Sequence, residues 1–319
     1  MKLVNASLIA ILLSIMAADP VSAQMMDVVR IKVKDREKVA PAPLDPTPVI
    51  SWVDSDVETK AVIVCVHGLG LHKENYKEFG ERIAKDGYAV YSMDVRGFGE
   101  FQQLPGDRKC DFNKCLDDVC EALKVARAMH PGVPVFILGE SMGGAIAMRV
   151  TEEHPELMDG LISSVPGAKR YGQNKSALQV GMKLLTGGKN AEVNVADTVV
   201  AQSTQNEQLR QEWLKDKMAR FTLTAGELMQ FQSFMDSNER NAHKIDKTPV
   251  LMVQGNSDRL VKQSDNKSIL DHLVVDDKML VFVDGGEHLI FEEGQFKEDA
   301  IKMLYAWIAE HSKSKQKTI

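Results

Sequence analysis

The sequence has few of the features by which proteins bind nucleic acid or a nucleotide cofactor. Its formal net charge is −6, and lysines cluster only in the short run Lys313–Lys317, which we expect to be a solvated end. It contains no internal repeat, no phosphate-binding P-loop and no glycine pattern typical of dinucleotide-binding folds. These absences argue against a nucleic-acid partner, and we expect no cofactor.

Cysteine is also scarce, with four residues in a chain of 319. Their spacing does not resemble a zinc site and no histidine pair accompanies them, so we expect no bound metal. Cys65 and Cys120 fall within apolar patterns and are expected to be small core residues. Cys115 and Cys120 lie on one predicted helix but point in different directions. Cys110 and Cys115 remain as a pair that could form a disulfide in an oxidising compartment.

A mainly apolar stretch, Leu3–Met16, lies at the amino end. It follows the positive charge of Lys2 and is shorter than the ~20 residues that a membrane-spanning helix needs. The small residues that end at Ala23 fit a cleavage site. We therefore predict a signal peptide at residues 1–23, cleaved after Ala23, and a secreted or periplasmic protein. If the segment were retained, the chain would instead be anchored to a membrane, as in a scaffold protein.

The motif Gly-Glu-Ser-Met-Gly-Gly, centred on Ser141, lies between a predicted strand at 134–138 and a predicted helix at 145–150. A serine on this sharp connection is a nucleophile elbow, which presents its hydroxyl at the end of the sheet, where a substrate can reach it. A side chain at Gly139 or Gly143 would clash with the neighbouring strand or helix. A chance occurrence of the motif would lack this context, so we predict Ser141 as a catalytic nucleophile.

Two later strand patterns carry the partners that a serine nucleophile needs. The apolar runs 249–255 and 278–283 end just before Asp258 and His288, in the chain order of nucleophile, acid and histidine. Serine is a weak nucleophile until a base takes its proton, and we assign that role to His288. Asp258 would fix the imidazole tautomer and stabilise the imidazolium.

A fourth strand pattern, at 61–66, ends in a loop that begins with His67 and Gly68. Because parallel strands deliver their following loops to one edge of a sheet, this loop is expected beside the serine. We predict that His67 and Gly68 support the site. The backbone N–H groups of Leu69 and Met142 would hold the developing oxyanion.

Together these motifs resemble the monoacylglycerol lipase and lysophospholipase group of α/β-hydrolases, over about residues 50 to 310. The resemblance implies an α/β fold with a mostly parallel central sheet flanked by helices, and a helical cap inserted into a domain at 24–319. It also implies hydrolysis of acyl esters such as monoacylglycerols or lysophospholipids, with transient contact to a lipid surface. The elbow residue Glu140 further resembles plant members, which include caffeoylshikimate esterases. The residues that carry the resemblance are His67–Gly70, Asp94–Gly99, Gly139–Gly144, Gly255–Asp258 and Glu287–His288.

Three other functions remain open on the same residues. A serine peptidase or an acyltransferase would use the same triad, and only assays separate them from an esterase. A non-catalytic ligand-binding member of the fold would be expected to lack the nucleophile or the histidine, and neither is missing here. Asp94 and Arg96 could be mistaken for catalytic groups, but we expect them to brace their loop.

The segment from about 168 to 243 is the predicted cap. Leu178, Met182 and Leu185 form a helical stripe that ends at two glycines. Such a stripe packs against the core in most proteins, although it could also line an acyl pocket beneath a lid. Further strands are predicted at 28–33, 49–53, 88–93 and 157–165, and further helices at 75–86, 112–130, 223–234 and 295–311.

Overall fold

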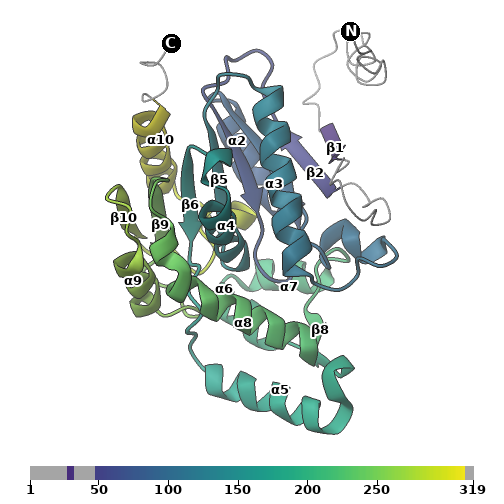
Figure 1. The fold of residues 1–319 in the computed structure, drawn as a ribbon. Helices are drawn as coiled ribbons and strands as arrows, with labels where there is room; N and C mark the ends of the chain where they lie inside the picture. Colours follow the sequence, from purple (N-terminus) through teal and green to yellow (C-terminus); the bar gives the residue numbers. More distant parts are fainter. Residues whose placement is uncertain (1–26, 32–46, 313–319) are drawn as a thin grey trace, which may run out of the picture.

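The computed structural model describes residues 27–31 and 47–312, without the side chains of 27–31 and 173–179, and is built on an eight-stranded sheet (Figure 1). The strands lie in the order β1-β2-β4-β3-β5-β6-β9-β10. The predicted signal peptide and the lysine-rich tail lie outside the described residues. The strands are β1 Asp27–Ile31, β2 Thr47–Trp52, β3 Ala61–Val66, β4 Tyr88–Met93, β5 Val135–Glu140, β6 Gly160–Ser164, β9 Val250–Gly255 and β10 Lys278–Val283.

All neighbours from β4 to β10 in this order pair in parallel, while β2 pairs antiparallel with β4 and with β1. The prediction of a mostly parallel sheet is confirmed. The central strands are continuous apolar runs because helices cover both faces of the sheet. In β3, for example, Ile63 packs into the core on one face and Val64 into the core on the other.

Helices outside the cap region cover the sheet (Figure 1). Apolar residues of α2 and α10 pack with Ile63, whereas those of α3, α4 and α9 pack with Val64 on the opposite face. The helix α3 begins at Asp111, whose side chain accepts the N–H of Lys114 as an N-cap. The helices are α2 Lys77–Ala84, α3 Phe112–Met129, α4 Met142–Glu153, α9 Gln263–His272 and α10 Glu298–Ser312. No helix of the described chain is both long and apolar enough to cross a membrane.

The chain between β6 and β9, here called the insert, forms a helical layer at one end of the sheet (Figure 1). Its helices agree in part with the predicted ones, whereas α6 and a small antiparallel sheet were not expected. The elements of the insert are α5 Gln173–Gly187, β7 Glu192–Asn194, α6 Ala196–Ser203, α7 Glu207–Lys215, β8 Thr222–Thr224 and α8 Ala225–Asn241.

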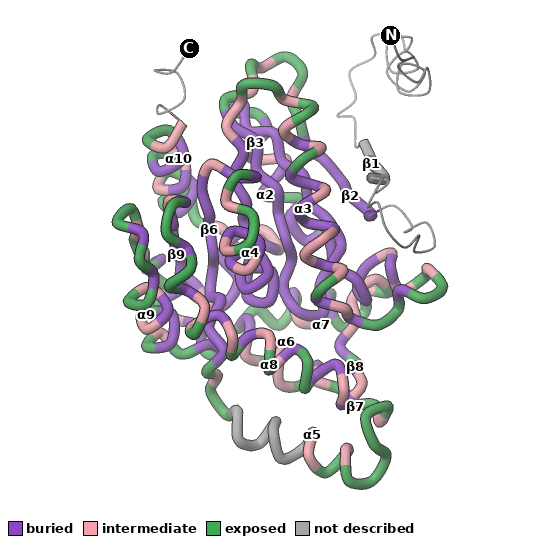
Figure 2. Tube along the Cα trace, viewed as in Figure 1, coloured by how far each residue is buried: buried purple, intermediate pink, exposed green. Residues whose placement is uncertain are grey.

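The predicted stripe on α5 is wrong. Met182 is 56% exposed and Leu185 is 86% exposed, and the side chain of Leu178 lies outside the described residues. Val180 and Leu184, which are four apart and share a helix face, pack against the core instead. The reason is that α5 lies at the outer rim of the molecule, where only one face meets other elements (Figure 2).

The predicted disulfide is also not present. Cys110 and Cys115 are buried free thiols, as are Cys65 and Cys120. Burial, and then the neighbouring Cys110 thiol, raise the pKa of Cys115 well above its usual value. Both thiols belong to the main hydrophobic core, where they pack as small apolar residues.

Candidate active site

Ser141 sits at the junction of β5 and α4 in a strained backbone conformation. Its φ is 54° and its ψ is −114°, and its N–H donates to the Ser164 carbonyl at 2.8 Å. A Cβ atom at Gly139 would lie 2.1 Å from the carbonyl oxygen of Gly143, and one at Gly143 would lie 1.9 Å from that of Val66. Only glycine fits such contacts, as the motif indicated. The turn therefore fixes where the serine hydroxyl can point.

Asp258 and His288 meet at the ends of β9 and β10. The imidazole Nδ1 lies 3.0 Å from Asp258 Oδ2, and both side chains are buried. The other carboxylate oxygen, Oδ1, accepts the N–H groups of Leu260 at 2.7 Å and Val261 at 3.0 Å. The carboxylate is thus held from two sides, and it keeps the imidazole proton on Nδ1. The second ring nitrogen, Nε2, is left to act as a base.

Ser141 and His288 line the same small cavity, of about 30 Å³, beneath the insert. A cavity of this size holds one or two water molecules. Ser141 is only 7% exposed, which differs from the expected accessible position at an open sheet edge, because the insert covers the elbow.

A larger cavity of about 280 Å³ lies next to this one, within the insert. Its lining includes Val180 and Leu184 from α5 and Leu228 from α8, and most of it is apolar. The two cavities share a wall. The residues of this wall are Leu69, Arg170, Val199, Phe231 and Leu260.

The loop after β3 lies against the elbow. A Cβ atom at Gly68 would lie 3.7 Å from Cβ of Ser141, and Leu69 lines the small cavity. His67 Nε2 accepts the N–H of Val95 at 2.9 Å, so its proton is on Nδ1, which donates to the Gly68 carbonyl at 2.8 Å. Burial lowers the pKa of His67 to about 3. His67 is therefore a neutral brace of this loop and not a base.

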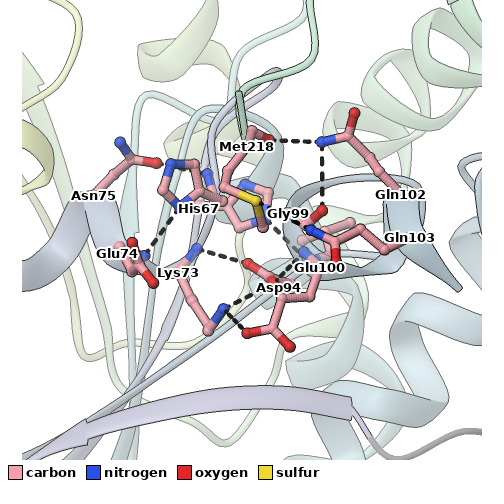
Figure 3. Close-up of polar contacts among 12 residues, drawn as sticks. His67, Lys73, Glu74, Asn75, Asp94, Gly99, Glu100, Gln102, Gln103 and Met218 are labelled. Atoms are coloured by element: carbon pink, nitrogen blue, oxygen red, sulfur yellow. Dashed lines mark hydrogen bonds and ion pairs between the residues drawn. The ribbon is translucent and has the colours of Figure 1, made fainter. Parts of the chain in front are cut away.

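Ion pairs join the segment around Lys73, which follows β3, to the loop that follows β4 (Figure 3). Lys73 Nζ lies 3.2 Å from Asp94 and 2.8 Å from Glu100, and Asp94 also accepts the backbone N–H groups of both residues. Arg96 forms two hydrogen bonds to Asp118, at 2.7 and 3.0 Å. Asp94 and Arg96 thus brace their loop, in agreement with the sequence-based expectation.

The insert is bonded directly to the loop that carries the histidine. The N–H of His288 donates to the Ser203 carbonyl at 3.3 Å, and Thr204 Oγ1 donates to Glu287 at 2.5 Å. The next residue, Leu289, packs with apolar side chains of α6 and α7. Sequence reasoning did not predict these contacts. The position of His288 therefore depends in part on the insert.

A second link between the loops was also not predicted. Glu140, next to the serine, accepts three backbone N–H groups from beyond the histidine: Ile290 at 2.8 Å, Phe291 at 2.9 Å and Glu292 at 2.7 Å. Glu292 Oε1 accepts the N–H of Gly68 at 2.8 Å. Both carboxyl groups are fully buried. Through these two side chains the elbow, the histidine loop and the loop after β3 are joined.

Within residues 27–31 and 47–312, no group of three or more histidine, cysteine, aspartate or glutamate side chains could hold a metal ion. The polar residues of the site instead form the serine, histidine and carboxylate arrangement described above. This set of groups is suited to acyl transfer.

The sheet order, the elbow and the strand-end loops define the protein as an α/β-hydrolase. The chain belongs to the family described as "Serine aminopeptidase, S33" (Hydrolase_4), which matches residues 57–295. The predicted resemblance to monoacylglycerol lipases is confirmed, and with it the prediction of a carboxylic ester hydrolase.

Two relatives and one solved structure are similar to this chain, the solved structure in its fold alone. A monoacylglycerol lipase of Mycolicibacterium smegmatis is 24% identical over 261 residues, covering 80% of this chain and 90% of that protein. The human monoglyceride lipase is 27% identical over 239 residues, covering 73% and 77% of the two chains. The crystal structure of a soluble monoglyceride lipase variant from Saccharomyces cerevisiae, in complex with a substrate analog, has a TM-score of 0.74 at 17% identity. That match covers 92% of this chain and 99% of the other.

Proposed function

We propose that the protein hydrolyses lipid esters through a covalent acyl-enzyme, with Ser141 as nucleophile, His288 as base and Asp258 as the group that orients it. The observation that carries this proposal is the buried pair of His288 and Asp258 at the cavity of the strained elbow serine. Each of the three comes from a different strand end, and their combination in one place fits the requirements of acyl transfer.

In the proposed reaction, Ser141 Oγ attacks the ester carbonyl carbon while its proton passes to His288 Nε2. The carbonyl oxygen becomes an oxyanion, which the N–H groups of Leu69 and Met142 stabilise. The bond to the alcohol then breaks, and the imidazolium protonates the leaving oxygen. A water molecule repeats the sequence on the acyl-enzyme: its proton goes to His288, the acid is released, and Ser141 regains its hydrogen.

The adjoining apolar cavity supports a substrate with an acyl chain. Its lining from α5 and α8 is mainly aliphatic and aromatic, and each methylene buried there would contribute about 0.8 kcal/mol. We therefore propose monoacylglycerols or lysophospholipids as substrates. The names of the relatives favour esters over the alternative of peptide bonds.

Inhibition and mutation test this function together. A fluorophosphonate should label the wild type at Ser141, and Ser141→Ala should abolish both labelling and the hydrolysis of monoacylglycerols. Ser163→Ala is a matched control, because this serine is also buried near the elbow but donates to the Gly144 carbonyl. Hydrolysis that persists in a folded Ser141→Ala protein would refute the assignment of the nucleophile. Aminoacyl anilides in the same panel test the peptidase alternative.

We also propose transient contact of the insert with a lipid surface. Met182 and Leu185 are exposed apolar side chains on α5, and such residues gain free energy on entering a membrane interface. Met182→Ser/Leu185→Ser should reduce sedimentation with phosphatidylcholine vesicles and leave hydrolysis of dissolved short-chain esters unchanged. Equal sedimentation of both proteins would contradict this contact.

For the cellular location, we propose export with cleavage after Ala23. Sequencing the amino end of the protein recovered from an expressing cell tests this directly. The proposal predicts that the mature chain begins at Gln24, and a chain that retains residues 1–23 would contradict it.

A further inference from the structure

Two buried carboxyl groups, those of Glu140 and Glu292, lie next to the proposed catalytic residues and accept different numbers of hydrogen bonds. Burial raises the pKa of Glu140, and the three backbone N–H groups that it accepts offset part of this effect because they favour the ionised form. Glu292 accepts only one backbone N–H group, that of Gly68, among the described residues. Its second oxygen, Oε2, has no hydrogen-bond partner in the part of the chain that the structure describes. Two fully buried carboxyl groups that repel each other are not both ionised unless a cation offsets them, and neither forms an ion pair with any residue that the structure describes.

The surroundings of Glu292 favour the neutral acid. Burial raises its pKa well above the usual value, and the Glu140 carboxylate raises it further. The other groups that face it are Glu293 beside it in the chain, Cys65 of β3 and Tyr76, whose hydroxyl donates to the Val66 carbonyl. None of these is a cation. Tyr76 and the Gly68 N–H lower the pKa of Glu292, but burial and Glu140 raise it by more.

We propose that Glu292 is a positioning residue for the oxyanion hole, acting as an uncharged carboxylic acid that fixes the loop after β3. This inference rests on the proposed function. Its Oε1 accepts the N–H of Gly68, the residue before Leu69, whose own N–H is the proposed oxyanion donor. Glu140 holds the backbone of Glu292 in turn, so the donor is placed relative to the serine through two buried side chains.

Gly68 lies in contact with the elbow and with Glu292. Gly68 has the Glu140 carbonyl, Ser141 and Glu292 all within 3.6–3.8 Å of where a Cβ would be. If the Gly68 N–H lost its partner, the His67–Gly68 peptide could rotate and displace the next peptide, which carries the Leu69 N–H. Misplacement of a catalytic donor by about 1 Å lowers the rate by about 10²-fold. Ground-state binding of the acyl chain occurs in the other cavity and would change little.

The test compares Glu292→Gln with Glu292→Leu on a short p-nitrophenyl ester. The glutamine keeps an oxygen acceptor and cannot ionise, so its kcat at neutral pH should stay within about twofold of wild type. The leucine has no acceptor, and its kcat should fall about 10²-fold with KM nearly unchanged. Glu292→Leu with wild-type kcat, or Glu292→Gln as impaired as Glu292→Leu, would overturn the proposal.

A pH profile provides a second readout, which remains informative if the leucine variant fails to fold. As pH rises through its raised pKa, Glu292 ionises against Glu140, and the loop should shift in the wild type. Wild-type kcat should therefore decline as pH rises through that raised pKa while the protein is still folded, and the kcat of Glu292→Gln should not. If the kcat of wild type and that of Glu292→Gln change in the same way as pH rises, the proposal is overturned. Fluorophosphonate labelling of Ser141 distinguishes a failure of the proposed function from a failure of the role of Glu292. If Ser141 is labelled and Ser141→Ala is inactive while the Glu292 tests fail, only the role of Glu292 is wrong.

Discussion

The cavity within the insert leads to a prediction about chain length that two neighbouring residues of α5 can test. Leu184 lines this cavity, whereas Met182, two positions away on the same helix, is 56% exposed. In the wild type, each methylene added to the acyl chain should gain about 0.8 kcal/mol, or about fourfold in kcat/KM, until the cavity is full. Its volume of about 280 Å³ provides room for a chain of several methylenes.

Leu184→Ser replaces apolar wall by a hydroxyl, and should lower kcat/KM for chains that reach it by about 1–3 kcal/mol, roughly 5- to 150-fold. Acetate esters do not extend into this cavity and should be hydrolysed at the wild-type rate. Met182→Ser is the matched control, with the same serine on the same helix, and should affect neither class of soluble ester. The assay is kcat/KM for p-nitrophenyl esters from acetate to dodecanoate.

Two results would refute this reasoning. An equal loss on acetate and long-chain esters in Leu184→Ser would mean that Leu184 only maintains the fold. Similar losses in Leu184→Ser and Met182→Ser would mean that the acyl chain runs along the outside of α5. Thermal unfolding of both variants distinguishes either result from a general loss of stability.

Four further outcomes can be checked with standard measurements. His288→Ala should be inactive, and Asp258→Asn should lose about 10⁴-fold in kcat because the imidazole takes the wrong tautomer, as steady-state kinetics will show. Gly143→Ala should lower the melting temperature sharply, since its Cβ would lie 1.9 Å from the Val66 carbonyl oxygen; an unchanged melting temperature would contradict the turn geometry. His67 is neutral in the folded protein and has a usual pKa near 6.5, so stability should fall as pH drops from about 6.5 toward 3, with proton uptake on acid unfolding. All four cysteines should alkylate in denaturant without reductant, and fewer than four modifications would restore the disulfide hypothesis.

The central sheet was predictable because its strands are short apolar runs bounded by glycine, proline or polar residues. The strand predicted at 278–283 matches β10, Lys278–Val283. The positions of Asp258 and His288 just beyond strand ends follow from the apolar runs of β9 and β10. Helix α9 was missed because its sequence is mainly polar and only a few of its residues, such as Ile269, are buried. The strands β7 and β8 have three residues each, too few to show a period.

The residues of the site were predictable only where a short local motif identifies them. The elbow motif identifies Ser141 from a handful of neighbouring residues. Glu292 could not be found in this way, because its partner Gly68 lies 224 positions away along the chain. The wrong prediction of the α5 stripe has a related cause. Periodicity locates apolar residues on a helix, but the packing of the whole insert decides whether the side of Met182 or that of Leu184 faces inward.

The insert leaves the sheet after β6 and returns to it at β9, and these two strands are direct neighbours, with Leu161 paired to Val250 and Ser164 to Val253. Because the two strands are parallel, the chain leaves β6 at the sheet edge that carries Ser141 and enters β9 at the opposite edge, one strand away. Lengthening or shortening such a connection costs little, about 0.6 kcal/mol for each doubling of length. During divergence, this segment can be lengthened, trimmed or exchanged without altering strand order. What an exchanged segment must still supply is a carbonyl where Ser203 now accepts the N–H of His288. Substrate choice can thus change by exchange of this segment, while selection on its contacts with the histidine loop preserves the chemistry.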